Sequence, residues 1–362
     1  LGPFMCKKIC FLLLFITISY GCQREDVKKF KWKLQVQSPE ANLDYSEILK
    51  MAKKIKVMSS GQLDITVYPG GAKAITKGPK IFDGVKEGTT EMAAGWPNWW
   101  LKNDNAWAIL QGSPYLFMNF ASSMMYFHAG EGTKLANELA NKHGIIWRPG
   151  WWAGMELGLV SKTPISSLKD LKGKKIRIGP GIPSDVLVKA GGAFAIPAVP
   201  SKIKTLLENN LLDGVEWTTA NGTYSMDFHK EGANFKNVTR HIIAPAVWQP
   251  SVLSDILISK KAFDSLPSNL QQILETAINE YNLLMTLRGK KADMEAFEKF
   301  KKEGVSVKRW PLEDFKAWKN ASESVYSKHL NKSQSFKKIF ESKINFKKRY
   351  DEYMKVFGPY DK

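Results

Sequence analysis

The sequence predicts an α/β fold with mixed, mostly parallel sheets, divided into two lobes and ending in a helical tail. Three observations support this prediction. The first elements alternate as strand, helix and strand, an order that normally builds a parallel sheet covered by helices. The chain has 362 residues, 44% of them hydrophobic, which is enough for two cores. An apolar stripe beyond Leu266 is long enough for a helix that crosses both lobes.

The opening unit is the clearest pattern. Residues 32–36 alternate between apolar and polar and predict a strand, and residues 45–55 place their apolar side chains on one helical face. The Ser-Ser-Gly run at 59–61 ends that helix. Alternation resumes at 63–67 and stops at the turn 69–71, which predicts a second strand.

Later elements show the same spacings of apolar residues, but less regularly. Before residue 220 we expect a helix at 79–87, a strand at 90–94, an aromatic loop at 95–107, a helix at 133–142, strands at 144–148 and 174–178, a helix after Ser184, a helix at 203–209 and a strand at 212–217. The long helix begins at Pro267 and extends to about Lys302. Beyond residues 305–310 the chain is lysine-rich, aromatic and predicted to be helical to its end.

Residues 1–22 have the pattern of an export signal. Lys7 and Lys8 precede an apolar run that is too short to span a membrane comfortably. The run ends in Ser-Tyr-Gly-Cys, which is similar to a lipoprotein processing site at Cys22. Ser19 and Tyr20 depart from the usual pattern of such a site, an aliphatic residue followed by a small one, so simple cleavage is the alternative. Leu1 to Phe4 are interpreted as foreign to the native chain. All three cysteines lie in this segment, so the remaining chain has no disulfide framework or thiolate metal site.

The formal net charge of +18 first suggests nucleic acid as a partner. The lysines are nevertheless spread along predicted helices and do not alternate with aromatic residues as a nucleic-acid groove requires. We therefore predict no nucleic-acid partner, and interpret the charge as a solvated surface that also steers small anions.

Motifs for catalysis are missing from the sequence. It has no GxSxG elbow, HExxH helix or P-loop, and its five histidines lack metal-ligand spacing. We predict a binding protein and not an enzyme. A periplasmic enzyme on the same fold is the alternative, and turnover of candidate acids would distinguish the two.

Arg177 is the main candidate for binding. It lies between Ile176 and Ile178 at the end of a predicted strand, just before a helix start. A guanidinium can hold both oxygens of a carboxylate, and the positive end of the following helix would favour the same anion. The local pattern alone also fits an ordinary surface or salt-bridged arginine.

Six segments together resemble the solute-binding proteins of TRAP (tripartite ATP-independent periplasmic) transporters, of the DctP type. They are GQLDITVYPGGA, IFDGVKEGTTEMA, SLKDLKGKKIRIGPGIPSDVLVKAGG, LLENNLLDGVEW, and FKNVTRHIIAPAVW with LISKKAFDSLP. The resemblance extends from about Lys31 to about Tyr350. It implies a two-lobed periplasmic-binding-protein fold, type II-like, which closes over a small organic anion and delivers it to a membrane permease.

The resemblance also implies roles for individual residues. Arg177 matches the arginine that grips the substrate carboxylate. Glu216 and Trp217 match the branch that binds 2-oxo acids or lactate, in which the glutamate side chain and the tryptophan backbone hold a bridging sodium or calcium ion. If no cation is bound, Glu216 hydrogen-bonds to ligand or structure instead.

One segment departs from that branch. Where Asn and Gln are usual, the alignment places Trp151 and Met155, and neither side chain supplies an amide oxygen. Glu156 is adjacent but is expected on the opposite face if the segment is a strand. Either another residue completes the cation shell, or the cation is absent.

Aromatic residues are dense around these points. Trp99 or Trp100 and Trp248 are the best candidates to line an apolar cleft, although core packing is the simpler explanation for any one tryptophan. Asn221, with Tyr224 and Asp227, follows Glu216 in a predicted loop and is a further candidate for ligand contact.

The predicted boundaries follow from the resemblance. Lobe I comprises 30–150 with 242–280, lobe II comprises 151–241 with 281–310, and 311–362 form C-terminal helices. These helices pack on the lobes or are exchanged in a homodimer, since some relatives exchange a C-terminal helix. A sensor that signals to a receptor is the alternative to transport, and neighbouring genes would separate the two.

Overall fold

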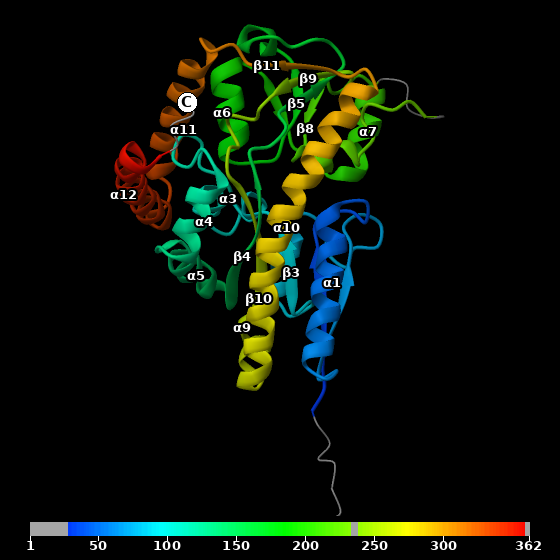
Figure 1. Ribbon diagram of the computed structural model, residues 1–362, viewed down its shortest axis with the longest axis vertical. Helices are drawn as coiled ribbons and strands as arrows, with labels where there is room; N and C mark the ends of the chain where they lie inside the picture. Colours follow the sequence, from blue (N-terminus) through cyan, green and yellow to red (C-terminus); the bar gives the residue numbers. More distant parts are fainter. Residues whose placement is uncertain (1–27, 233–237, 359–362) are drawn as a thin grey trace, which may run out of the picture.

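Two β-sheets with helices on their faces form the body of the protein. The computed structural model describes residues 28–232 and 238–358. Figure 1 shows the sheets one above the other along the long axis, with the first sheet in the lower half. The predicted α/β fold with two lobes is present. The export signal and Cys22 lie outside the described residues, so their roles stay predictions.

The first sheet has the strand order β2-β1-β3-β10-β4. Its strands are β1 (Phe30–Val36), β2 (Leu63–Tyr68), β3 (Met92–Gly95), β4 (Ile145–Gly154) and β10 (Val252–Ser259). β1 pairs in parallel with β2 and β3, whereas β10 runs antiparallel to β3 and β4. Helix α1 (Leu43–Met58) connects β1 to β2, as the alternation of the opening segment predicts, and it buries Ile48, Met51 and Ile55.

The second sheet has the strand order β11-β9-β5-β8-β6-β7. Its strands are β5 (Leu159–Ser161), β6 (Lys175–Arg177), β7 (Phe194–Ile196), β8 (Gly214–Glu216), β9 (His241–Ala244) and β11 (Ser306–Arg309). β6 pairs in parallel with both β7 and β8. Because β6 and β8 point the same way, their last residues, Arg177 and Glu216, emerge at the same edge of the sheet.

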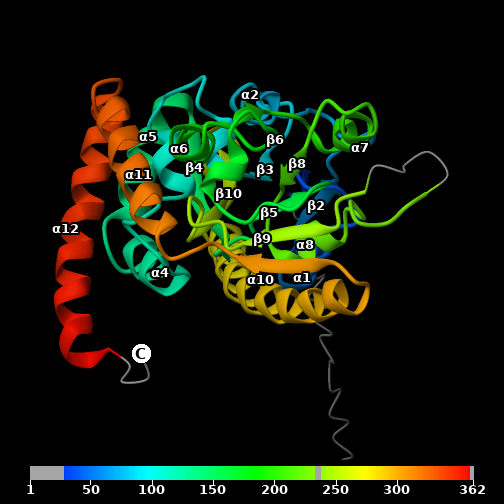
Figure 2. The same ribbon diagram turned by 90° about the horizontal axis from the view of Figure 1, so that it is seen from above.

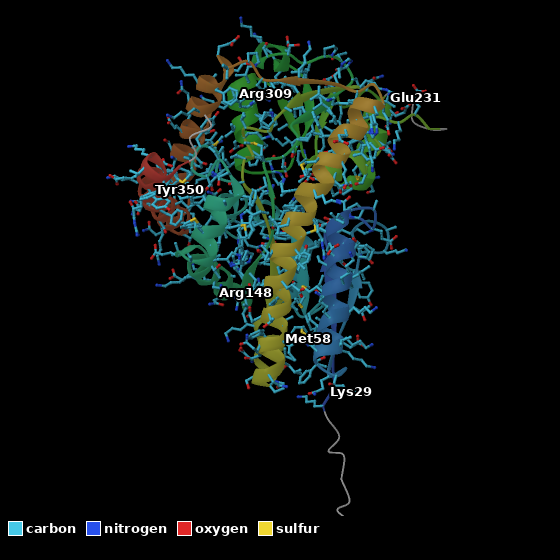
Figure 3. The ribbon with its side chains drawn as sticks, in the orientation of Figure 1. Lys29, Met58, Arg148, Glu231, Arg309 and Tyr350 are labelled. Carbon is cyan, nitrogen blue, oxygen red and sulfur yellow. The ribbon has the colours of Figure 1, made fainter. Side chains whose placement is uncertain are left out.

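Helix α10 (Ser268–Lys302) is 35 residues long and contacts elements of both halves. Its first part packs against α1 and β4, and its last part against α8 (Ala220–Tyr224) and β11. Arg148 of β4, labelled in Figure 3, fastens it through two hydrogen bonds to Glu275, of 2.8 and 2.5 Å. The predicted lobe-crossing helix is therefore present.

The C-terminal helices α11 (Asp314–Leu330) and α12 (Gln334–Phe357) form an outer layer along one side of the molecule (Figure 2). They pack on the shorter helices α3 (Trp107–Gln111), α4 (Phe120–His128), α5 (Gly132–Ala140) and α6 (Ile182–Gly191). The remaining helices are α2 (Lys80–Lys86), α7 (Pro200–Glu208) and α9 (Lys260–Asp264). Thus α12 packs on its own chain here, and its exchange in a dimer stays a prediction, as do the lobe boundaries.

Candidate functional site

A cavity of about 350 Å³ lies between the two sheets. From the first sheet it takes residues just beyond strand ends, namely Gln37 after β1 and Asn98 and Trp99 after β3. From the second it takes Arg177 and Glu216, which end β6 and β8. The cavity therefore opens at the carboxyl ends of parallel strands from both sheets, the usual place for ligands in such folds.

Arg177 is 4% exposed and forms part of the wall. Its Nε donates to the carbonyl of Ala198 at 3.0 Å, and its Nη1 donates to the carbonyl of Glu216 at 2.7 Å. The guanidinium carbon lies 4.6 Å from the centre of the Trp217 ring, which holds its plane by stacking. No described residue accepts a hydrogen bond from Nη2, so part of the fork is left for an occupant of the cavity.

Two carboxylates share this wall. Glu216 is 2% exposed, with its Oε2 3.8 Å from Arg177 Nη1, and Glu156 is 4% exposed. Burial raises the pKa of Glu156 well above its ordinary value, and the neighbouring charge of Glu216 raises it further. Burial lowers the pKa of Arg177, and the two carboxylates oppose that change.

The expected direction of Glu156 was wrong. The expectation assumed that a strand continues through residue 156, but β4 ends at Gly154, whose φ of 70° breaks the extended backbone. Alternation of side chains applies only within a strand. Glu156 lies beyond its end and lines the cavity with Arg177 and Glu216.

Several buried oxygens that face the cavity have no hydrogen-bond partner among the described residues. They belong to residues that line it: Gln37 Oε1, Thr76 Oγ1, Asn98 Oδ1, Gln111 Oε1, Glu156 Oε2, Glu216 Oε1, Thr218 Oγ1 and Gln249 Oε1. The indole Nε1 of Trp217 is likewise unpartnered. Buried polar atoms are normally paired, because leaving one unpaired costs about 1–3 kcal/mol. The cavity therefore suits an occupant that offers hydrogen-bond donors to these oxygens and a hydrogen-bond acceptor to the indole N–H of Trp217.

The other residues predicted for the site lie in different places. Trp99 and Trp217 line the cavity, whereas Trp100 is fully buried and donates from Nε1 to Asp255 Oδ2 at 2.9 Å. Trp151 packs edge-on against Trp96, with ring centres 5.6 Å apart, and is outside the lining.

Trp248 packs against Trp318 of α11, with ring centres 4.9 Å apart and planes tilted by 35°, in the core beneath the outer helical layer. Met155 is half-buried outside the lining. Asn221 borders a smaller pocket, and its backbone N–H donates to Asp293 Oδ1 at 2.9 Å. Tyr224 donates to Glu303, and Asp227 pairs with Lys230.

Sequence reasoning missed most of the polar lining. Glu156 and Gln249 are single polar residues inside aromatic and apolar tracts, which is a signal that could have found them. Gln37, Asn98 and Gln111 come from loops and a helix end whose approach to the second sheet no local pattern reveals.

Two α/β lobes that enclose a polar cavity at the ends of their strands define a binding protein for a small solute. Residues 35–333 match the family described as bacterial extracellular solute-binding protein, family 7. This chain belongs to that family, as its sequence motifs predict.

Three known proteins show the extent of the similarity. The chain is 25% identical over 320 residues to a monocarboxylate 2-oxoacid-binding periplasmic protein of Nostoc sp., covering 88% of this chain and 84% of that protein. A TRAP periplasmic solute-binding protein from Pseudoalteromonas atlantica, solved with bound sodium and pyruvate, gives a TM-score of 0.80 at 25% identity and covers 91% of this chain and 97% of its own. One from Colwellia psychrerythraea, solved with bound calcium and pyruvate, gives 0.80 at 25% identity, with coverage of 91% and 98%.

Two features are absent from residues 28–232 and 238–358. No helix in these ranges combines the length and the apolarity needed to cross a membrane. No three His, Cys, Asp or Glu side chains in these ranges gather into a ready metal cluster. A cation in the cavity would therefore draw on amide, hydroxyl or backbone oxygens as well as carboxylates.

Proposed function

We propose that this protein captures a small monocarboxylate, such as a 2-oxo or 2-hydroxy acid, between its lobes and delivers it to a TRAP membrane permease. The observation that carries the proposal is the buried Arg177, which lines the cavity and whose Nη2 has no hydrogen-bond partner among the described residues. The similarity to a 2-oxoacid-binding protein and to two pyruvate-bound structures supports the same ligand class.

Arg177 supplies the carboxylate grip. Its Nε and Nη1 are already bonded to the carbonyls of Ala198 and Glu216, so the guanidinium is fixed before a ligand arrives. Charge-assisted hydrogen bonds contribute about 1.5–3 kcal/mol each, and fixing the fork in advance lowers the entropy lost on binding. The small volume, near 350 Å³, suits a short acid better than a long one.

A cation fits the same cavity. The oxygens of Glu216, Glu156 and Gln249 are hard donors of the kind that sodium and calcium prefer. When bound, such an ion supplies positive charge to a keto or hydroxyl oxygen of the acid. Glu216 and the Trp217 backbone would hold it, while Arg177 holds the carboxylate.

Lobe closure is supported by contacts that bridge the cavity. Asn98 Nδ2 donates to the carbonyl of Pro180 at 2.9 Å, and Ser225 Oγ donates to Asn42 Oδ1 at 3.2 Å. Both bonds join a loop of the first sheet to an element of the second. Closure around the acid would create the surface that the permease recognises.

A thermal-shift screen tests the proposal. Monocarboxylates, dicarboxylates, sugar acids and sulfonates are compared, each with and without calcium, and the best acid is then measured on Arg177→Ala. We expect a monocarboxylate to raise the melting temperature of the wild type and not that of Arg177→Ala. An intact shift in the variant, or a preference for dicarboxylates, would reject the proposal. Turnover of the acid would indicate an enzyme.

A further inference from the structure

The loop between β2 and α2, residues 69–79, forms one wall of the cavity. These residues form neither helix nor strand, and none of residues 70–79 is buried. Most of the loop lines the cavity, mainly with small side chains: Gly70, Gly71, Ala72, Ala74, Thr76, Lys77 and Gly78. A segment without buried side chains gains little from apolar packing, so its position depends on hydrogen bonds.

The side chain of Gln35 on β1 ties this loop to the sheet. Its Nε2 donates to the carbonyls of Tyr68 and Pro69 at 3.2 and 3.1 Å. Its Oε1 accepts from the N–H groups of Ile75 and Thr76 at 2.7 and 3.4 Å. One amide thus joins the start of the loop to its later part and attaches both to β1.

Gln35 is completely buried, although the alternation at residues 32–36 groups it with the polar residues of its strand. Its Nε2 also donates to the carbonyl of Val36 at 2.8 Å, so this nitrogen contacts only carbonyls while Oε1 contacts only N–H groups. These partners fix the orientation of the amide. A buried amide is unfavourable unless both of its ends are paired, and here both ends are paired with the loop.

Other contacts constrain the loop less. The N–H of Gly70 donates to the carbonyl of Ser38 at 2.8 Å, which fixes only the first residue of the cavity lining. Lys73 pairs with Glu40 at the surface, where ion pairs contribute little to stability. Within residues 28–232 and 238–358, only the bonds to Gln35 join residues 75–76 to the sheet.

We propose that Gln35 is a positioning residue for the solute: by holding residues 69–76 it fixes the loop that walls the cavity, and so determines which length of acid the cavity admits. Gln35 is outside the cavity lining and acts only through the loop. The inference rests on the proposed function, in which this cavity holds the acid. A wall that is fixed before binding reduces the entropy lost when the solute arrives, and it excludes acids that are too long.

The variant Gln35→Met tests the proposal, because it keeps a long unbranched side chain and removes the hydrogen bonds. Calorimetry with the best acid should show an affinity lower by about tenfold or more, since the N–H groups of Ile75 and Thr76 lose their acceptor. The ratio of affinities for pyruvate and 2-oxohexanoate should shrink by about threefold or more, because a loosened wall selects less by length. A purely structural role would leave this ratio unchanged.

Gln271→Met is the matched control. Gln271 Nε2 donates to the carbonyls of Phe263 and Leu266, both at 3.1 Å, and Gln271 is outside the cavity lining. This variant should lower the melting temperature and leave both the affinity and the length ratio unchanged. An unchanged affinity and ratio in folded Gln35→Met, or equal changes of the ratio in both variants, would overturn the inference.

Hydrogen exchange of the unliganded wild type tests the proposal without a variant. The N–H of Lys73 lies in the same loop and has no acceptor among the described residues, whereas that of Ile75 bonds to a buried oxygen. We expect the N–H of Ile75 to exchange about 100-fold more slowly than that of Lys73, or slower still. Equal exchange rates at the two positions would reject the inference even if Gln35→Met failed to fold.

The two proposals fail in different ways. If the screen finds a dicarboxylate and no monocarboxylate, the proposed function fails, and the same variants measured with that solute still decide the role of Gln35. If a monocarboxylate binds to the wild type and to Gln35→Met with equal affinity and equal length preference, the inference fails and the proposed function stands.

Discussion

The cavity wall and the outer helical layer each bury a cation, in opposite surroundings. Arg177 contacts two backbone carbonyls and lies beside two carboxylates, with one side open to the cavity. Lys343 of α12 is 1% exposed, donates to the Ile109 carbonyl at 2.5 Å and to Ser113 Oγ at 2.7 Å, and pairs with no described carboxylate. Burial lowers the pKa of Lys343 to about 7.

The difference shows which region is arranged for binding and which for stability. Around Lys343 lie the rings of Phe117, Tyr126 and Phe127, each within 6 Å of Nζ, so the space is filled. Around Arg177 the unpartnered buried atoms are mostly oxygens, and they belong to residues that line the same cavity. Mutations in the two regions should therefore affect different measurements.

The largest expected effect is on the stability of the outer layer. Trp318 of α11 is fully buried against Trp248 and Trp310. Trp318→Ala should lower the free energy of unfolding by about 3–5 kcal/mol, because it removes a large side chain from a packed core. Denaturant unfolding measures this loss, with the exposed Phe357→Ala as control. Affinity for the acid should stay within about twofold, and a larger loss would show that the two regions are coupled.

The next effect concerns the cavity. Arg177→Lys keeps the charge but loses the planar fork, so affinity for the best acid should fall by roughly tenfold to 100-fold in calorimetry. Arg148→Lys is the matched control, since Arg148 makes a two-point contact with Glu275 outside the cavity. It should affect stability and not binding. If both variants lost the same affinity for the acid, the loss in Arg177→Lys could not be assigned to the position of Arg177 in the cavity.

Lys343→Met tests how the buried lysine in the outer helical layer makes the free energy of unfolding depend on pH. Because the folded-state pKa of Lys343 is about 7 and its ordinary value is 10.5, the unfolded chain binds more protons between these values. Wild-type stability should therefore rise with pH across that window. The Met variant lacks this dependence, so its stability relative to the wild type should fall as pH rises through the window.

Unfolding curves at several pH values, for wild type and Lys343→Met, give the comparison. The wild type with bound acid serves as a control for ligand effects. A constant difference between the two proteins across the window would contradict the buried, readily deprotonated state of Lys343.

The smallest effect should come from the bridge over the cavity. Asn98→Ala removes the bond to Pro180 and one lining oxygen, so affinity should fall by about threefold to tenfold, the value of one hydrogen bond. Asn221→Ala is matched in residue type but lies outside the cavity and uses its backbone N–H, so it should leave affinity unchanged. Calorimetry on both variants would show whether Asn221, a candidate from sequence, contacts the ligand.

The sequence predicted those elements whose apolar residues are spaced with the period of a strand or of a helix. The alternation at 32–36, the helical face at 45–55 and the long stripe of α10 all depend on local spacing, and the corresponding elements are present. The position of Arg177 at the end of β6 was predictable for the same reason.

The polar lining depended on tertiary structure that spacing cannot encode. Glu156 was misplaced because a strand ended two residues before it, and strand ends are hard to locate from sequence. The tryptophans were ambiguous because an indole fits a core and a cleft equally well. Trp99 lies in the cavity wall and the next residue, Trp100, in the core, because the chain turns at Pro97–Trp99 and directs consecutive side chains to different places.

The length of helix α10 gives it the geometry of a lever arm. Gly289 is the one glycine in this helix, and an added Cβ there would meet Met285 and Trp151 only at ordinary contact distances of 3.4 and 3.5 Å. A lack of space therefore does not require glycine at this position. From Gly289 to Lys302 the helix runs roughly 20 Å, so a bend of about 10° shifts its end by roughly 3 Å. A small rotation at the solute would thus be magnified at Glu303, which holds Tyr224 and His229 at 2.5 and 2.9 Å.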